Sequence, residues 1–404
     1  MAGRYDTDYE YPFRQESNFL YLSGIQEPGF SMILHLGSGE YHVFAPRRDA
    51  QFAVWHGFIT SREDYKAQYK PDRLHYGDEL NTVLKKMDPD TVFCLDQKQA
   101  APLQIEGHKT DDNLLKDALA YCRIIKTEWE LDQLRTASDV AGKAHTEIMS
   151  GLKAGMKEYE IKALYEYVTT SHGLVHHPYN GIFATGKNSA VLHYVESKGE
   201  LKDGDYFLVD AGAECNGYAA DITRTHPVSG SFTSIQHDIY HITLKAQNNA
   251  LNKIKPGVKM EDLHLGACRD IIEGLTDIGL IIGNIDEMMD NNIFSLFFPH
   301  GLGHLMGLDT HDVGGYPKGV KKIDRPGVKY LRARITLEPG MVLTIEPGLY
   351  MIPALLGPAF ENPEQAKFLN IPRLKDLFGL GGVRIEDNVI VTETGKENMT
   401  KVSK

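Results

Sequence analysis

Five residues in the second half of this sequence combine four carboxylates with one imidazole, a set of side chains that binds divalent cations. Each lies in a short segment of unusual composition: VDAGAE, YAADITRT, HGLGHLMG, LTIEPGLY and GGVRIEDN. Oxygen-rich sites with one imidazole suit Mn²⁺, or Co²⁺ and Fe²⁺, better than a thiolate-type zinc site. If these side chains converge, the chain is a two-metal hydrolase with a hydroxide between the ions as its nucleophile. The residues are Asp210, Asp221, His304, Glu346 and Glu386.

Asp210 and Asp221 lie on two strand-like runs that are joined by a turn rich in glycine and asparagine. A two-residue loop at Cys215-Asn216 would place the two aspartates directly opposite each other, and a loop at Asn216-Gly217 would place them diagonally. Either register keeps both carboxylates on one face, because side chains alternate along a strand. The alternative is a pair of solvated hairpin acids, since antiparallel sheets often expose one face to water.

Two glutamates lie at or inside apolar strands. Glu346 ends the predicted strand 341–346, which Pro347 terminates, and Glu386 lies inside the strand predicted over 383–391. Acids in such strands are rarely buried without a partner, so the choice is between metal binding and an exposed sheet face.

The imidazole of the set belongs to a glycine-rich run, His300-Gly-Leu-Gly-His304. The glycines indicate a loop or a close backbone approach rather than a helix. A single histidine would more often be structural, but His300, His304 and His311 are clustered here, which favours a site.

The elements that must position these residues follow from hydrophobic periodicity and capping signals. Thr127 and Glu130 form a predicted capping box at the start of a long helix. The pattern predicts an α/β (α+β) chain with a small N-terminal mixed α/β domain over residues 1–121. A catalytic domain over 122–404 follows, with helices flanking one antiparallel sheet. Further helices are expected over 111–121, 158–170, 234–254 and 260–275, and strands over 31–36, 41–44, 91–95, 182–184, 206–211 and 218–223.

The bulk composition excludes several other classes of protein. The 404 residues are 42% hydrophobic and 24% charged, with a net charge of −12, which disfavours nucleic acid as a partner. The sequence contains no apolar run of about 18 residues, so no membrane span is expected. The first residues are polar, unlike a signal peptide, and the four cysteines are scattered without CxxC spacing. These features predict a cytoplasmic protein.

At this point the chain resembles a known family, the pita-bread metallopeptidases of family M24, and most of all its prolidase (Xaa-Pro dipeptidase) branch. The resemblance rests on FRQES (13–17), NSAVLHY (188–194), PHGLGHLMGLDTHDVGGYPKGV (299–320) and GGVRIED (381–387). It implies a pita-bread catalytic domain and hydrolysis of Xaa-Pro dipeptides with two divalent ions, Mn²⁺ first among them.

The resemblance also implies a role for each ligand. Asp210 would hold one metal, Asp221 and Glu386 would bridge both, and His304 with Glu346 would complete the second. Glu346 would also carry a proton from the attacking water to the leaving imino nitrogen.

Substrate contacts are implied in the same way. His193 and His311 would polarise the scissile carbonyl and steady the oxyanion. Arg332 would grip the C-terminal carboxylate of a dipeptide, although a surface arginine is the alternative. His300 would support its loop and line the pocket, and Tyr179 either lines the pocket or packs in the core.

The remaining implications concern support and assembly. Arg384 and Thr223 would orient the ligands. Trp55 matches a tryptophan near the family's dimer contact, so a homodimer is expected. The family usually carries a further segment ahead of the FRQES-like motif, whereas only twelve residues precede Phe13 here. We therefore expect a shortened N-terminal domain.

Three rival functions stay open from the sequence. Aminopeptidase P, which acts on longer peptides, shares the context around Arg332. A non-catalytic binding protein of this fold, or the metal-free creatinase type, should show substituted ligands, whereas this chain has all five.

Overall fold

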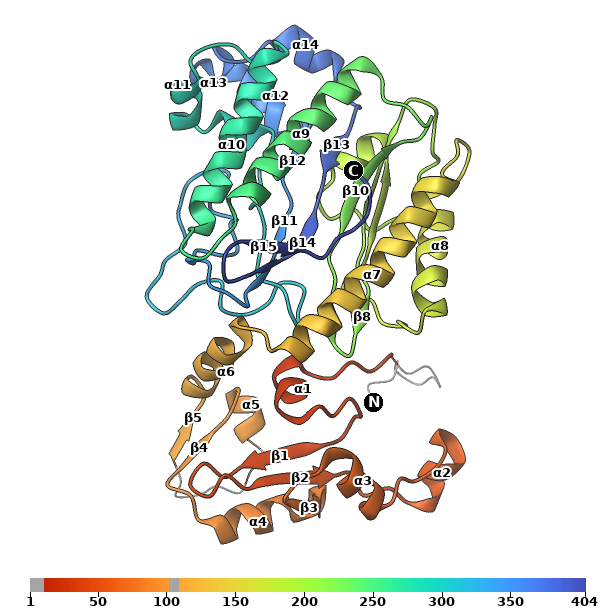
Figure 1. The fold of residues 1–404 in the computed structure, drawn as a ribbon, viewed down its shortest axis with the longest axis vertical. Coiled ribbons are helices and arrows are strands. Elements are labelled where there is room, and N and C mark those ends of the chain that lie inside the picture. Colours follow the sequence, from red (N-terminus) through yellow and green to blue (C-terminus); the bar gives the residue numbers. More distant parts are fainter. Residues whose placement is uncertain (1–10, 102, 104–108) are drawn as a thin grey trace. The chain divides into compact units, whose positions relative to one another are not determined.

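The computed structural model describes residues 11–101, 103 and 109–404. The polar stretch 1–10, on which the absence of a signal peptide was argued, lies outside the described residues. The chain divides into two compact units, Met1–Cys122 and Arg123–Lys404 (Figure 1). Among the described residues, no helix is long and apolar enough to cross a membrane.

The first unit is a mixed α/β structure, as predicted. β1 pairs antiparallel with β2 in the expected hairpin, and β3 adds to β2 in parallel. β4 and β5 form a separate parallel pair. A small core of Ile25, Val43, Tyr65 and Leu74 holds the first sheet to α3. The elements are α1 (Ser17–Ser23), β1 (Ser31–Leu34), β2 (Tyr41–Ala45), α2 (Ala50–His56), α3 (Arg62–Tyr69), β3 (Arg73–Tyr76), η1 (Gly77–Glu79), α4 (Leu80–Met87), β4 (Thr91–Phe93), α5 (Gln97–Ala100), β5 (Lys109–Asp111) and α6 (Leu114–Ile124).

The helices of the second unit begin where the sequence predicts. Thr127 and Glu130 form the capping box of α7, with Thr127 N donating to Glu130 Oε2 at 2.7 Å. Figure 1 shows α9 and α10 running alongside each other over the strands. The helices are α7 (Glu128–Gly151), α8 (Glu158–Ser171), η2 (Gly186–Ala190), α9 (Ser234–Lys253), α10 (Met260–Asp277), α11 (Ile285–Asp290), η3 (Ile293–Leu296), α12 (Pro353–Glu361), α13 (Pro363–Ala366) and α14 (Ile371–Asp376).

The first strand ladder of this unit carries the two aspartates. β8 and β9 pair through a two-residue loop at Asn216-Gly217, and β7 pairs with β10 in the same register, with Asp210 opposite Thr223. The diagonal alternative for Asp210 and Asp221 is therefore the correct one. The strand predicted over 218–223 is wrong in one respect, because its ladder is interrupted around Asp221. The strands are β6 (Ile182–Thr185), β7 (Tyr206–Asp210), β8 (Glu214–Cys215), β9 (Tyr218–Ala219) and β10 (Thr223–Pro227).

The second ladder carries the two glutamates and is interrupted in the same manner. β11 pairs with β14 and β12 with β13 in one continuous register, so that Glu346 stands opposite Glu386 at the gap. The single strand predicted over 383–391 is therefore two strands. Glu386 N donates instead to Thr223 O at 3.0 Å, in a bridge that joins the two ladders. The strands are β11 (Val342–Ile345), β12 (Gly348–Tyr350), β13 (Gly382–Arg384), β14 (Asp387–Val391) and β15 (Lys396–Asn398).

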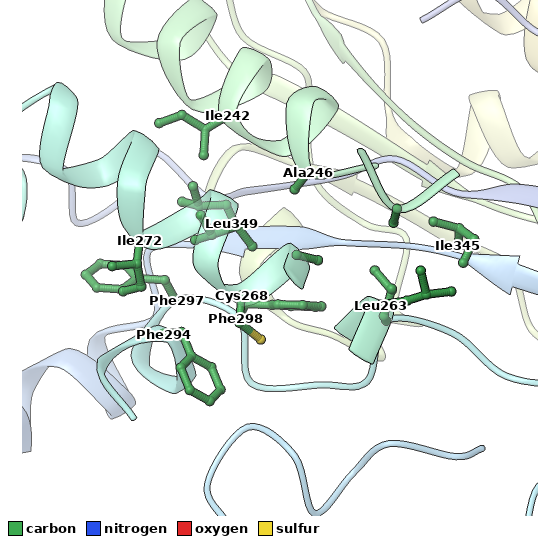
Figure 2. Packing of buried hydrophobic residues seen from close by; sticks show 14 of the residues in the cluster. Ile242, Ala246, Leu263, Cys268, Ile272, Phe294, Phe297, Phe298, Ile345 and Leu349 are labelled. Atoms are coloured by element: carbon green, nitrogen blue, oxygen red, sulfur yellow. The ribbon is translucent and has the colours of Figure 1, made fainter. Parts of the chain in front are cut away.

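A large apolar core holds the second ladder against the helices. Ile242 and Ala246 of α9 and Cys268 and Ile272 of α10 pack toward the strand residues, among them Ile345 (Figure 2). Burial of such side chains contributes about 1.5–3 kcal/mol each, which fixes the strands that carry the glutamates.

Candidate metal centre

The four carboxylates lie where the strand ladders break or end. Asp210 is the last residue of β7, and Asp221 lies between β9 and β10. Glu346 follows β11, and Glu386 lies between β13 and β14. Antiparallel pairing fixes these positions, while the interruption frees each side chain to turn toward one point. The bridge between Thr223 and Glu386 brings the two gaps together.

Three of the residues meet in a buried cluster. Ligand atoms of Asp221, His304 and Glu386 all lie within 4.8 Å of one another. His304 Nε2 is 3.4 Å from Asp221 Oδ2 and 3.5 Å from Glu346 Oε1, which brings Glu346 to the same point. Tyr179 Oη donates to Asp210 Oδ1 at 2.8 Å and to Asp221 Oδ1 at 2.5 Å. All five predicted ligand residues therefore converge.

Backbone contacts with β11 hold His304 in place. Thr344 N donates to His304 O at 3.0 Å, and Glu346 N donates to Leu302 O at 2.7 Å. A Cβ at Gly303 would overlap Thr344 O, so the close approach expected from the glycines is present. His304 Nδ1 donates to Leu305 O at 3.0 Å, which leaves Nε2 as the nitrogen with a free lone pair.

Neighbouring side chains orient two of the carboxylates. Thr223 Oγ1 donates to Glu386 Oε2 at 2.6 Å, and Arg384 Nη2 donates to Asp210 Oδ2 at 2.5 Å. The other guanidinium nitrogen, Nη1, donates to Tyr350 Oη at 2.9 Å. Thr223 and Arg384 thus each contact a predicted ligand residue, as expected of groups that orient the ligands.

The negative charge of the buried carboxylates is not balanced by the cations of the protein itself. Burial, and then the charge of neighbouring carboxylates, raises the pKa of Asp221, Glu346 and Glu386 well above its ordinary value. Arg384 opposes this shift but is a single cation. Among the buried polar atoms that the structure describes, Glu386 Oε1 has no hydrogen-bond partner. A buried carboxylate oxygen without a partner is costly unless a cation compensates it.

His300 lies beside the cluster with both ring nitrogens engaged. Its Nδ1 donates to Gly301 O at 2.8 Å, and its Nε2 accepts from Tyr350 Oη at 2.8 Å. Its Nδ1 is also 3.9 Å from Glu346 Oε2. His300 therefore supports the loop beside Glu346 and has no nitrogen left for a metal.

Of the predicted substrate-facing groups, His311 contacts the cluster directly. The ring of His311 meets that of His304 edge-on, with centroids 4.4 Å apart. His193 and Arg332 are exposed. Burial lowers the pKa of His304 and His311, and the cation of Arg332 adds to the shift of both. Tyr179, which bonds two ligand carboxylates, lies in the site and not in a remote core.

Comparison with known proteins identifies the class to which this geometry belongs. A family model described as metallopeptidase family M24 matches residues 132–393. The chain belongs to metallopeptidase family M24. A second model, the aminopeptidase P N-terminal domain, matches residues 1–93.

Individual M24 relatives cover nearly the whole chain. The Xaa-Pro dipeptidase of Rattus norvegicus is 40% identical over 413 residues, covering 99% of this chain and 84% of the relative. The Xaa-Pro dipeptidase of Homo sapiens is 39% identical over the same coverage. The zinc-substituted aminopeptidase P of E. coli in complex with product has a TM-score of 0.83 and 32% identity, covering 99% and 88% of the two chains. The fold is the pita-bread fold that the sequence predicted.

The donor set of this M24 metallopeptidase fits divalent metal ions. Four carboxylates, one imidazole with its Nε2 lone pair directed at two of them, and an unpartnered Glu386 Oε1 make an oxygen-rich cage. Burial first, and then the repulsion between the neighbouring carboxylates, raises the pKa of Asp221, Glu346 and Glu386, and bound cations would offset both effects.

Sequence reasoning missed two supporting residues. Tyr350 links Arg384 to His300, and Thr344 Oγ1 accepts from His304 N at 3.2 Å. Both lie within the segment LTIEPGLY, which had drawn attention only for Glu346. Alternation along a strand places Thr344 and Glu346 on one face, and this was the available signal.

Proposed function

We propose that this M24 metallopeptidase is a Xaa-Pro dipeptidase that works with two divalent metal ions, Mn²⁺ first among them. The observation that carries the proposal is the convergence of Asp210, Asp221, His304, Glu346 and Glu386 around an unpartnered buried carboxylate oxygen. Relatives named Xaa-Pro dipeptidase over the full length of the chain support the substrate class.

The ligand roles that we propose are those implied by the family resemblance, and the contacts are compatible with them. Asp221 and Glu386, which are the most buried of the four predicted ligand carboxylates, would bridge the two ions, and Asp210 would hold the first. His304 and Glu346, which are 3.5 Å apart, would hold the second. When bound, the ions would activate a water molecule as the nucleophile and polarise the scissile carbonyl.

Glu346 is the proposed proton carrier. Its side chain is partly exposed (18%), unlike that of Glu386. A carboxylate within reach of the attacking water can take a proton from it and release the proton to the leaving nitrogen. That nitrogen needs the proton, because the proline nitrogen has no hydrogen in the peptide bond.

His193, His311 and Arg332 would bind the substrate. The two imidazoles would donate to the carbonyl oxygen as negative charge develops on it. The exposed guanidinium of Arg332 would pair with the free carboxylate of the dipeptide through two parallel hydrogen bonds. His300 and Tyr179 would line the same pocket.

The test compares matched substrates. With Mn²⁺ restored after chelation, the protein should hydrolyse Xaa-Pro faster than Xaa-Pro-Xaa, and chelation alone should abolish turnover. The second candidate is Xaa-Pro aminopeptidase activity, which the likeness to E. coli aminopeptidase P favours. A clear preference for the tripeptide would replace the dipeptidase assignment with that activity.

We also propose that the protein is a cytoplasmic homodimer. Three large apolar side chains in and after α2 support a contact between copies: Val54, Trp55 and Phe58 are all strongly exposed. Light scattering should give twice the chain mass, and Trp55→Ser should shift the equilibrium toward monomer. A monomeric wild-type protein at micromolar concentration would contradict this.

A further inference from the structure

Glu158 is a fully buried carboxylate at the start of α8, and nothing in the proposed mechanism uses it. Oε1 accepts from Thr185 N at 2.8 Å and from Asn188 Nδ2 at 3.0 Å. Oε2 accepts from Tyr194 Oη and from Gly199 N, both at 2.7 Å. Four donors on one buried carboxylate balance the large cost of removing its charge from water.

All four donors belong to one segment, residues 185–199. The segment leaves β6, passes through the short helix η2 and continues without regular structure as far as an isolated bridge at Glu200. Its far end is also tied to the same residue by the backbone, because Glu158 N donates to Gly199 O at 3.0 Å. Glu158 therefore bonds the beginning, the middle and the end of this loop.

The loop carries His193, which directly precedes Tyr194 in the chain. The imidazole of His193 is exposed, yet it is near enough to His300 and His311 to contribute, after the larger effect of burial, to their lowered pKa values. No strand ladder holds the chain at this point. The placement of His193 thus depends on the hydrogen bonds that the neighbouring tyrosine and the loop ends make.

We propose that Glu158 is a positioning residue that fixes the 185–199 loop so that His193 meets the substrate. The inference rests on the proposed function, in which His193 donates to the scissile carbonyl. Glu158 acts through the loop and does not touch the ligand residues.

The geometry requires a glutamate and a glycine at the two ends of this contact. Glutamine has one acceptor oxygen, and its amide would present hydrogens to two of the four donors, which would leave buried N–H or O–H groups unpaired. A Cβ at Gly199 would lie 2.6 Å from Glu158 Oε1, so a side chain there would push the carboxylate away. Both changes should release the same loop.

The experiment is a double-mutant cycle on the Mn²⁺-loaded enzyme. Glu158→Gln and His193→Ala should each lower kcat/KM for a Xaa-Pro dipeptide, by on the order of 10²-fold. The double variant should be no slower than His193→Ala alone, because both changes remove the same contact. Metal stoichiometry should stay at the wild-type value, and amide hydrogen exchange should accelerate over residues 185–199.

A matched control lies on the same helix. Glu166 is half-exposed and pairs with Lys162 at 3.8 Å, so Glu166→Gln removes the same charge without touching the loop. It should leave kcat/KM and exchange unchanged. Effects of Glu158→Gln and His193→Ala that multiply would overturn the proposal, and so would loss of metal from Glu158→Gln.

Tyr194→Phe keeps the test decisive if Glu158→Gln fails to fold. It removes one of the four donors and should give the same non-additive pattern with a smaller effect, about tenfold. The exchange measurement also separates this proposal from the proposed function. If the wild-type enzyme hydrolyses no Xaa-Pro substrate, the proposed function is wrong. If amide hydrogen exchange over residues 185–199 in Tyr194→Phe and Glu158→Gln equals that of the wild type, the positioning role of Glu158 is wrong, whatever the substrate.

Discussion

The proposed metal ligands and the proposed substrate-facing residues of this peptidase are held in place by different forces. Asp210, Asp221, Glu346 and Glu386 lie at gaps in two antiparallel ladders, so backbone hydrogen bonds on either side locate them. The substrate-facing histidines lie on loops that have no such ladder. Buried side-chain charges hold those loops instead, and a single substitution can therefore release a loop while the ligand set stays intact.

The loop of His311 shows this second arrangement most clearly. Asp312, the next residue, is buried and accepts from Arg123 Nη2 at 2.6 Å and from Lys126 Nζ at 3.0 Å. Arg123 Nη2 also donates to Asp309 at 2.8 Å, whose carboxylate is 44% exposed. Two cations, Arg123 at the end of α6 and Lys126 just before α7, and one buried carboxylate thus hold the loop.

The largest effect should come from a ligand that the ladders locate. Glu386→Gln removes the charge from the proposed bridging position, so the protein should fold but lose bound metal and all measurable turnover. Metal content by mass spectrometry and hydrolysis of a Xaa-Pro dipeptide check this. Glu393→Gln, an exposed residue just after β14, is the control and should behave as wild type. Near-normal activity in Glu386→Gln would remove its bridging role.

The next effect tests the loop anchor rather than the ladder. Asp312→Asn leaves Lys126 and Arg123 without their shared buried counter-charge, and should lower the free energy of unfolding by about 3–5 kcal/mol. Asp309→Asn removes a partly exposed partner of the same arginine and should cost under about 1 kcal/mol. Urea unfolding of the two variants measures both values. If the two variants lose the same free energy of unfolding, burial of Asp312 does not determine the strength of its ion pairs with Arg123 and Lys126.

A smaller effect should separate substrate binding from metal binding. Arg332→Met should raise KM for a dipeptide by about 10–100-fold, the value of a hydrogen bond to a charged group, and leave kcat and metal content unchanged. Arg334 provides the control, because it is engaged with Glu261 at 3.0 Å and should not affect KM. An unchanged KM in Arg332→Met would leave Arg332 as a surface arginine and favour the aminopeptidase alternative.

The same contrast explains what the sequence could predict. The five ligand residues, the capping box at Thr127 and the hairpin of β1 and β2 depend on local patterns, and all are present. The gap at Glu386 was not foreseen, since the apolar residues on both sides of it have the composition of one unbroken strand. The interruption depends on Thr223, a residue far away in the sequence, whose carbonyl oxygen accepts the hydrogen bond from Glu386 N.

Loop anchors were also beyond reach of the sequence. Glu158 occupies the first turn of α8, where an acidic residue is favourable for any helix, so its position gave no sign of four donors from another segment. Arg123 and Lys126 lie just after the domain boundary predicted at residues 121–122, and nothing in their local sequence indicates a partner in the His311 loop. Contacts over such separations follow from the tertiary fold and not from periodicity.

The smallest effect should separate the pH dependence of the fold from that of the site. Burial lowers the pKa of His264 to about 4, while its Nε2 donates to Gly327 O at 3.0 Å. In the unfolded chain its pKa is about 6.5. The contribution of the neutral His264 ring to the free energy of unfolding is therefore complete above that pH and declines as the pH falls toward about 4.

In metal-free protein, His264 should therefore account for a loss of about 2 kcal/mol in the free energy of unfolding between pH 7 and pH 5. His264→Gln should flatten the urea-measured pH profile by about that amount, whatever its own effect at pH 7. A variant profile parallel to that of the wild type would show that the ring is charged in the folded state. The acid sensitivity of the metal-free protein would then have to come from the carboxylates at the ladder gaps or from other buried histidines such as His145, whose pKa burial also lowers.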